Sequence, residues 1–311
     1  MSLSRPRIAV VGSSNVDLVC RSPRLPLPGE TLLGSSFLTV PGGKGANQAA
    51  AAAGLSAQVD FIGCVGADDF AAAALAGLRE RGVGLEHVRI AADQPTGVAL
   101  ILVDEATGEN SIVVVSGANH ALRDADVAAA EETLAAADMI VCSLEVPLSA
   151  VEIAAEIGAR RGAAVLLNPA PAKRLPETLL ARCAVLTPNE HEAALVAGLP
   201  EGASPRESAA ALRAAGVENV VVTLGGAGCA AFVAGAERRV AAAPIGTVVD
   251  TTAAGDCFTG ALAVALAEKR PWDEALRFAS AAAGLTTTRP GAQASLPGRE
   301  EVESLLARWS G

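Results

Sequence analysis

The sequence predicts an α/β fold in which a doubly wound, mostly parallel sheet is flanked by helices and carries a small separate β layer. Two observations predict this fold. Short runs rich in Val, Ile and Leu alternate with Ala-rich helical segments along most of the 311 residues, which is typical of βα units on a parallel sheet. Two other stretches contain β-type runs without a helical period. We therefore expect one domain, 1–311, whose β layer comes from about 14–43 and 95–117.

The elements of the main sheet follow the order that βα units require. A first strand is expected at Arg7–Gly12, and a helix at Gly45–Gly54 leads to a strand at Val59–Val65. Ligands of such sheets bind outside the carboxyl ends of the strands. The other expected strands are Met139–Leu144, Ala164–Asn168, Ala184–Thr187 and Val220–Leu224. The other expected helices are Asp68–Arg81, Asp124–Ala136, Leu148–Arg160, two that start near Glu190 and Ser204, two near the end of the chain, and a last one at Arg299–Trp309.

The small β layer is expected from two polar or proline-rich stretches. Leu18–Gly43 contains β-type runs such as Thr31–Leu33 and Phe37–Val40 between its prolines. Further along, Gly97–Val103 and Ser111–Val115 flank a polar turn. Two β-type runs around such a turn predict a hairpin.

Composition excludes several classes of function. The net charge of −10 argues against binding to a nucleic-acid backbone, which needs a basic face. The six Cys are scattered singly and only three His occur, so the spacing of a metal site is missing and buried, reduced thiols are expected. No uncharged stretch reaches the length of a membrane span, and the amino terminus does not resemble a signal peptide. We expect a cytoplasmic protein.

The stretch Asp250–Asp256 is the strongest candidate for chemistry. A β-type run, Thr247–Val249, enters it and a helix at about Ala254–Glu268 leaves it. The first N–H groups of a helix lack partners inside the helix, and the helix dipole makes that end positive. Asp256 in the first turn would act as a proton acceptor beside developing negative charge. The alternative is an ordinary first-turn acid after a tight turn. The small residues that would let a ligand approach are Ala253, Ala254 and Gly255.

A second group of candidates would suit a polyol. In Gly42–Gln48 a glycine turn feeds a helix, but the phosphate-loop pattern is absent. The amide of Asn47 offers both a donor and an acceptor. Asn15 and Asp17 follow the first strand, and Glu145 follows another. Each is equally compatible with an ordinary turn or loop residue.

A third group would suit a nucleotide and its metal. Asn189 and Glu192 lie three residues apart at a helix start, so they share a face that could hold hydrated Mg²⁺. An N-cap with first-turn acids is the alternative. The glycine-rich stretch Thr223–Gly228 could admit a phosphorylated ligand or form only a hairpin.

Together these motifs resemble those of the ribokinase-type (PfkB) sugar kinases. The two signatures are Gly42–Gln48 and Asp250–Asp256, and the resemblance covers about Arg7–Arg308. Further matching motifs are Gly12–Asp17, Pro28–Thr31, Gly117–Asn119, Asn168–Ala172 and Thr187–Glu190. The resemblance implies ATP-dependent phosphorylation of the 5-hydroxyl of D-ribose, and a β-sheet lid that is used in dimerisation. Alternatives are another sugar of the same family (deoxyribose, a ketohexose, a keto-deoxy acid or a nucleoside) or a non-catalytic sugar sensor.

The resemblance also implies the roles of particular residues. Asp256 is the base, and the amides of Ala253, Ala254, Gly255 and Asp256 stabilise the transferred phosphoryl group. Glu192 acts through the water shell of Mg²⁺. Sugar contacts fall on Asn15, Asp17, Gly43, Lys44, Asn47, Glu145 and Asp256. Nucleotide contacts fall on Asn189, Thr223, Gly225, Gly226, Gly228 and Gly255, with Ser280 where relatives often have a larger polar side chain near the adenine.

A monovalent cation is expected beside the phosphoryl-binding turn. If buried, Asp250 needs a partner, and the irregular segment Thr286–Ser295 could aim backbone carbonyls at one point. Oxygen ligands with little charge suit K⁺. The alternative is a direct pair between Asp250 and Arg289. The resemblance places the ion on Asp250, Thr252, Thr286, Arg289, Gly291 and Ser295.

Overall fold

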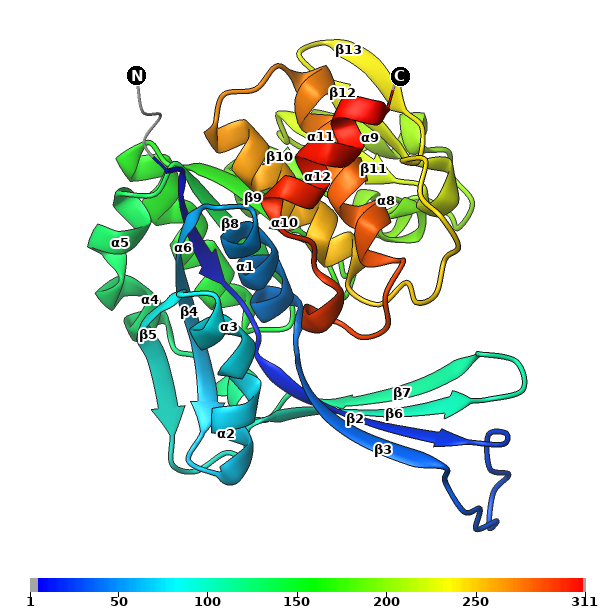
Figure 1. Ribbon diagram of the computed structural model, residues 1–311. Helices are drawn as coiled ribbons and strands as arrows, with labels where there is room; N and C mark the ends of the chain where they lie inside the picture. The colour runs from blue at the N-terminus through cyan, green and yellow to red at the C-terminus, as the bar shows by residue number, and fades with distance from the viewer. Residues whose placement is uncertain (1–4, 310–311) are drawn as a thin grey trace.

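The main body is built on one nine-stranded sheet with helices on both faces (Figure 1). The structure is a computed structural model that describes residues 5–309. The strand order is β13-β12-β11-β10-β9-β8-β1-β4-β5, and all neighbouring pairs are parallel except those of β12 and β13. The strands are β1 (Arg7–Val11), β4 (Gln58–Gly66), β5 (Gly84–Ala91), β8 (Met139–Ser143), β9 (Ala164–Asn168), β10 (Val185–Leu186), β11 (Asn219–Thr223), β12 (Cys229–Val233) and β13 (Ala236–Val240).

Two hydrophobic cores cover the two faces of this sheet. Successive strand residues alternate between them: Ile8 and Val10 belong to one core, and Ala9 and Val11 to the other. Both sides of the parallel strands are therefore apolar, as a doubly covered sheet requires. On the Ile8 side lie α1 (Lys44–Gly54), α2 (Asp69–Ala74), α3 (Ala76–Glu80), α10 (Ala254–Ala267), α11 (Trp272–Thr286) and α12 (Arg299–Arg308). On the Ala9 side lie α4 (Asp124–Ala129), α5 (Glu131–Ala135), α6 (Leu148–Arg161), α7 (Glu177–Leu180), α8 (Glu190–Ala197) and α9 (Pro205–Ala214).

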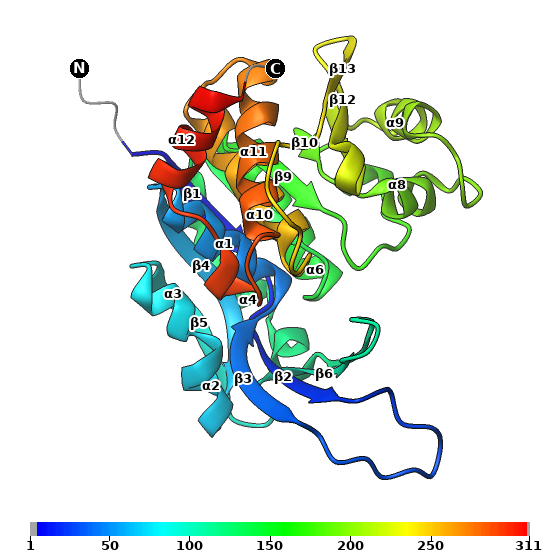
Figure 2. The ribbon, with the colours of Figure 1, turned by 45° about the vertical axis from the view of Figure 1, so that its right-hand side comes forward.

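A second, four-stranded sheet projects from the main body (Figures 1 and 2). Its order is β3-β2-β6-β7, with β2 (Asn15–Ser22), β3 (Ser36–Gly42), β6 (Gly97–Asp104) and β7 (Asn110–Val115). β6 and β7 form the predicted antiparallel hairpin. Every residue of β7 is exposed, so neither of its faces is covered by the rest of this chain. We call this sheet the projecting sheet.

Several predicted elements need correction. The helices expected at Asp68–Arg81 and Asp124–Ala136 are each two short helices, broken at Leu75 and at Ala130. Asp68 is the N-cap rather than the first helical residue. Runs of Ala favour helix formation but do not fix where a helix must turn to follow the sheet.

Some predicted strands do not form, and some observed strands were not predicted. Thr247–Val249 and Thr31–Leu33 are not strands, and Val248 and Val249 are more than half exposed. The predictions missed β5, which has few consecutive apolar residues, and the antiparallel strands β12 and β13, of which β13 lies at the edge of the sheet. The Thr223–Gly228 turn is thus the hairpin between β11 and β12.

The cysteine thiols are in the state that the sequence predicts. All six Cys are free, and all but Cys20 are buried. Among residues 5–309, no helix combines the length and apolar character needed to cross a lipid bilayer.

Candidate active site

The candidate residues converge at the carboxyl ends of the central strands, where an α/β sheet binds its ligands. Asn15 and Asp17 begin β2 just beyond β1, and Glu145 follows β8. The amino-terminal ends of α1 and α10 meet the same edge, and they bring Asn47 and Asp256 together. Segments far apart in the sequence thus form one site.

Small residues allow α1 and α10 to approach closely. A Cβ on Gly45 would lie 2.6 Å from the Gly12 Cα, and a Cβ on Gly260 would lie 2.6 Å from the Gln48 carbonyl oxygen. Both contacts involve backbone atoms. A larger residue at Gly45 would therefore push α1 away from the end of β1, and one at Gly260 would push α10 away from α1. This packing places the first turn of α1 against the first turn of α10.

Asp256 is buried, and amide groups hold both of its carboxylate oxygens. Asn47 Nδ2 donates to Oδ2 at 2.9 Å, and Gln48 Nε2 donates to Oδ1 at 3.3 Å. Burial raises the pKa of Asp256, while the nearby Lys44 ammonium and these amide donors oppose the rise. A buried carboxylate with a raised pKa is suited to accept a proton near neutral pH.

Three carboxyl groups and one ammonium group share the site. Burial, followed by the charges of Glu145 and Asp256, raises the pKa of Asp17 to about 7. The Asp256 carboxylate raises the pKa of Lys44 more than burial lowers it. Glu145 accepts hydrogen bonds from the Ser13 hydroxyl and, at 3.1 Å, from the Lys44 backbone N–H. The site is therefore rich in hydroxyl acceptors and retains one cation.

The paired glycines make room for this cluster. A Cβ on Gly42 would collide with the Asp17 carboxylate, and one on Gly43 would lie 2.8 Å from the Asn15 backbone nitrogen. Gly43 also has φ +89°, in the region that favours glycine. Asn15 is fixed from the far side, because its Oδ1 accepts a 2.7 Å hydrogen bond from Asn119.

The turn before α10 leaves backbone donors free. Ala253 adopts a left-handed conformation (φ +61°) as the N-cap, and the Ala254 N–H donates to the Thr251 carbonyl. Within residues 5–309, no protein acceptor receives the N–H of Gly255 or Asp256. Two N–H groups at the positive end of a helix are suited to bind an anion.

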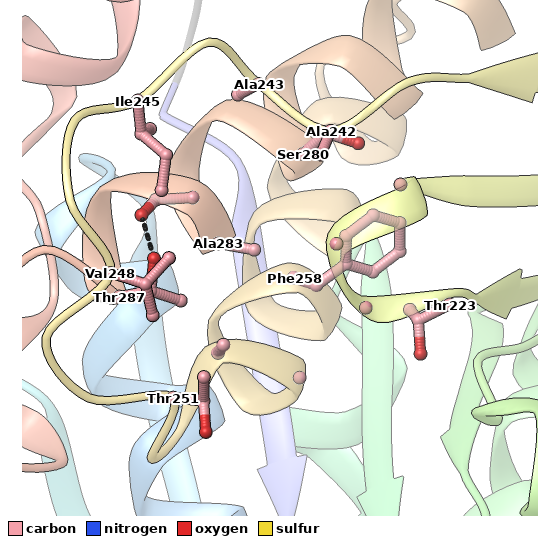
Figure 3. A pocket seen from close by; sticks show the side chains of 16 residues that line it. Thr223, Ala242, Ala243, Ile245, Val248, Thr251, Phe258, Ser280, Ala283 and Thr287 are labelled. Atoms are coloured by element: carbon pink, nitrogen blue, oxygen red, sulfur yellow. Dashed lines mark hydrogen bonds between the residues drawn. The ribbon is translucent and has the colours of Figure 1, made fainter.

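A cavity of about 470 Å³ lies on the other side of this turn (Figure 3). Gly255 lines the cavity, while the side chain of the next residue, Asp256, contacts Asn47. Of the predicted nucleotide contacts, those on the cavity wall are Thr223, Gly225, Gly226, Gly228, Gly255 and Ser280. Asn189 is not on the wall but forms a β-bridge with Thr223.

Sequence reasoning missed several residues of this region. Thr251 and Ala254, which belong to the predicted stretch Asp250–Asp256, also line the cavity. The part of the wall that was missed comes from the loop after β13 and from α10 and α11: Ala242, Ala243, Ile245, Val248, Phe258, Ala283, Gly284 and Thr287. These are mostly apolar residues whose type resembles that of the core, so the sequence held no signal for them. Gln48 was also missed, although it directly follows Asn47 in the recognised motif.

Asn189 and Glu192 form the N-cap that was their alternative interpretation. Asn189 Oδ1 accepts from the Glu192 N–H at 2.8 Å, and Glu192 Oε2 accepts from the Asn189 N–H at 2.9 Å. Burial raises the pKa of Glu192, which lies close enough to feel the charges of Lys44 and Asp256. Glu192 thus caps α8 at the border of the site.

Asp250 is held by the chain and not by Arg289. Its Oδ1 accepts from the backbone and hydroxyl of Thr252, and its Oδ2 accepts from the Gly291 N–H at 2.8 Å. Arg289 instead pairs with Glu301. The predicted alternative, a pair between Asp250 and Arg289, is therefore wrong. The hydroxyls of Thr286 and Ser295 donate to the Ala282 and Ala292 carbonyls.

Comparison with known proteins identifies a family. A family model described as pfkB family carbohydrate kinase matches residues 5–299. Ribokinase of Haemophilus influenzae is 40% identical over 304 residues, which cover 97% of this chain and 99% of that protein. Ribokinase of Schizosaccharomyces pombe is 41% identical over 95% of this chain and 96% of its own length. The structure of Arabidopsis thaliana ribokinase complexed with ribose and ATP is similar at a TM-score of 0.88 and 35% identity, over 98% of this chain and 99% of that one.

Proposed function

Because the chain belongs to the pfkB family of carbohydrate kinases, we propose that it transfers the γ-phosphoryl group of ATP to the 5-hydroxyl of D-ribose. The products are D-ribose 5-phosphate and ADP. The observation that carries the proposal is the position of Asp256. Its carboxylate faces the sugar-type cluster of Asn47 and Lys44, while the preceding residue, Gly255, lines the large cavity.

The geometry supports a direct transfer between the two sites. Asp256 accepts the proton of the sugar hydroxyl as the hydroxyl oxygen attacks the γ-phosphorus, and the bond to the ADP oxygen breaks. The free N–H groups of Gly255 and Asp256 donate to the equatorial phosphoryl oxygens. These donors are fixed before the reaction, so no reorganisation is needed to stabilise the developing charge. The Ala254 N–H, which the resemblance also assigned to this role, already donates to the Thr251 carbonyl.

The hydrogen-bond acceptors around Asp17 are suited to bind the hydroxyl groups of a sugar. Asn15, Asp17 and Glu145 accept hydroxyl protons, and Asn47 presents a buried Oδ1 without a partner among the described residues. Lys44 and the Gly43 backbone complete the subsite. A buried acceptor without a partner is costly, so a bound hydroxyl group would stabilise this arrangement.

A nucleotide fits the cavity beyond the turn. The walls are largely apolar, as expected for a base and ribose, and the glycines at 225, 226 and 228 let phosphates approach the backbone. Mg²⁺ would neutralise charge on the phosphates. In residues 5–309 no cluster of three or more His, Cys, Asp or Glu side chains could hold a metal, which fits an ion bound through phosphates and waters, with Glu192 on its water shell.

We further propose that the projecting sheet is a lid that also forms a homodimer. In β7, Ile112 to Val115 are consecutive, so their side chains point alternately to the two faces, yet each is about half exposed. Phe37 and Leu38 on β3 are also more than half exposed. One face can then cover the bound sugar while the other packs against a second copy. Lid closure would exclude water, which competes with the sugar as acceptor.

A panel of acceptors tests the proposal. ATP consumption is measured with D-ribose, 2-deoxyribose, fructose, a keto-deoxy acid and adenosine, with Asp256→Ala as the inactive control. We expect the highest kcat/KM with ribose, because a site built around a hydroxyl leaves polar groups unpaired when that hydroxyl is missing. Equal values for ribose and 2-deoxyribose would reject ribose as the preferred substrate. Sugar binding without ATP consumption would indicate a sensor.

A further inference from the structure

Gln48 occupies a position in the site that is distinct from that of its neighbour Asn47. Both amides donate to Asp256, one to each carboxylate oxygen. Each residue also keeps a buried amide oxygen, Asn47 Oδ1 or Gln48 Oε1, without a partner in the described chain, but Asn47 is 6% exposed whereas Gln48 is 0% exposed. A bound sugar can therefore compete for Asn47 but cannot reach Gln48.

The same Gln48 nitrogen that donates to Asp256 also donates to a second acceptor. Its Nε2 donates to Asn168 Oδ1 at 3.2 Å, and Asn168 Nδ2 in turn donates to the Thr187 carbonyl at 2.8 Å. The reversed amide would place Oε1 against two acceptor oxygens, so the hydrogen-bond partners define its orientation. The Gln48 amide thus ties Asp256 to the ends of β9 and β10.

The same chain of contacts returns to α10. The Thr187 hydroxyl lies 3.1 Å from the Thr259 hydroxyl, one turn beyond Asp256. A ring of side chains therefore links the first turn of α10, the first turn of α1 and two strand ends. Because every member is buried, water does not compete for these bonds.

We propose that Gln48 is a positioning residue that holds the Asp256 carboxylate in its reactive orientation while the sugar engages Asn47. This inference rests on the proposed function of Asp256 as the base. Gln48 supplies a neutral donor, which stabilises the ionised carboxylate without neutralising its charge. The carboxylate then remains an acceptor for the sugar proton.

Kinetics of two substitutions test the role. Gln48→Met keeps a similar volume but removes both donated bonds, and Gln48→Glu places a second acid against Asp256. For Gln48→Met we expect kcat to fall roughly 10- to 100-fold, since small misplacement of a catalytic group is costly, with the KM for ribose within about threefold of the parent. The acid limb of kcat/KM should move to higher pH, and further in Gln48→Glu, because a like charge disfavours ionisation of the base.

A buried amide far from the site provides the matched control. Asn219 begins β11, and among residues 5–309 its side chain bonds only the backbone of Ala184 and Ala234. Asn219→Ala should lower the melting temperature but leave the pH profile unchanged. A parental kcat and pH profile in Gln48→Met, or losses no different in kind from those of Asn219→Ala, would overturn the proposal. If Gln48→Met does not fold, Asn168→Ala removes the second acceptor of the same Gln48 nitrogen, so the amide is less well oriented and the acid limb should shift in the same direction.

A stability cycle separates this proposal from the proposed function. Unfolding is measured for the parent, Gln48→Met, Asp256→Ala and the double variant, without substrates. We expect Gln48→Met to cost less stability when Asp256 is absent, because the two side chains interact in the folded protein. Equal costs in both backgrounds would overturn the coupling, whatever the enzyme phosphorylates. If Gln48 and Asp256 are coupled but the protein phosphorylates none of the sugars, only the proposed reaction would be refuted.

Discussion

The Cα of Gly260 lies so close to Gln48 that a methyl group added there would be 2.6 Å from the Gln48 carbonyl oxygen. α1 and α10 therefore meet backbone to backbone at this point, without room for a side chain between them. The same contact sets the distance from Asn47 and Gln48 to Asp256. Gly260 thus sets the position of the base relative to the sugar subsite, although it belongs to neither.

Gly260→Ala should impair both stability and turnover. The added methyl group meets backbone, which cannot rotate away, so the helices must separate. Overpacking of this kind typically costs about 1–3 kcal/mol of unfolding free energy, and we expect kcat to fall with it. Denaturant unfolding and steady-state kinetics are the measurements. Gly246→Ala is the control, because a Cβ there would meet nothing within 4 Å. Equal behaviour of the two variants would refute the argument.

Asp256→Asn should keep the fold and lose activity. Asn has the same shape but cannot accept the sugar proton, and removal of a general base typically costs roughly 10²–10⁴-fold in rate. The melting temperature, measured beside the rate, checks that the fold is intact. Turnover of ribose within about threefold of the parent would show that another group is the base.

The polar residues of this site could be predicted because they occur in short motifs at strand ends. Asn15, Asp17, Asn47 and Asp256 each follow a strand or begin a helix, and the structure brings them to one edge of the sheet. A polar side chain at a strand end or a helix start needs a hydrogen-bond partner, so such residues can be recognised in the sequence as candidates for a binding site.

The cavity wall could not be predicted in the same way. Phe258 and Ile245 are apolar residues like those of the core, and only the folded chain shows that they face an open space. β13, at the edge of the sheet, was missed for a different reason. It has only exposed and half-buried residues and includes Glu237, Arg238 and Arg239, so it lacks the apolar run of a central strand.

The Asp17 carboxyl should make stability depend on pH. Its pKa is raised by burial, then by Glu145 and Asp256, to about 7 in the folded protein, whereas an unfolded Asp titrates near 3.9. Between these values the folded state holds a proton that the unfolded state releases, so stability falls as the pH rises toward about 7. Each unit of difference corresponds to about 1.4 kcal/mol.

Asp17→Asn removes this titration. We expect the melting temperature of the variant to rise relative to that of the parent between pH 5 and pH 8, in the absence of ligands. Asp93→Asn, at an exposed loop position, should show no such trend. Parallel curves for Asp17→Asn and the parent would show that the folded carboxyl titrates normally.

The cavity should discriminate weakly between purine bases. Among the described residues that line it, the only polar side chains are those of Thr223, Thr251, Ser280 and Thr287. The Thr287 hydroxyl donates to the Gly284 carbonyl at 2.8 Å, and the Ser280 hydroxyl lies 3.9 Å from the Cys229 sulfur. A pocket without dedicated hydrogen-bonding side chains rejects analogues poorly.

We therefore expect kcat/KM for GTP within about 100-fold of that for ATP, on the scale of apolar pockets. Ser280→Ala should leave the ratio within about threefold of the parent, because the serine hydroxyl is turned toward Cys229. Donor kinetics with ATP, GTP and ITP at saturating ribose provide the measurement. Discrimination of 10⁴-fold or more would mean that the base is read by specific hydrogen bonds.

K⁺ should activate the enzyme without entering the chemistry. The Asp250 carboxylate is half-buried and accepts from Thr252 and Gly291, but no cationic side chain forms a salt bridge with it in residues 5–309. Arg289, the one candidate partner in the neighbouring segment, pairs with Glu301. One carboxylate near the irregular backbone of Thr286–Ser295 offers oxygen ligands with a single negative charge, which suits a large monovalent ion.

The ion would stabilise the turn that leads to Ala253 and Asp256, so its effect should fall on kcat more than on the KM for ribose. The measurement is the initial rate in Tris or Na⁺ buffer with KCl added at constant ionic strength, and we expect a saturable increase. Asp250→Asn removes the charged ligand and should abolish the activation by K⁺. Glu301→Gln frees Arg289, which can then pair with Asp250 in competition with K⁺, so the activation should be weaker. A flat response in the parent, with full activity in the absence of K⁺, would show that the hydrogen bonds from Thr252 and Gly291 are sufficient to hold the turn.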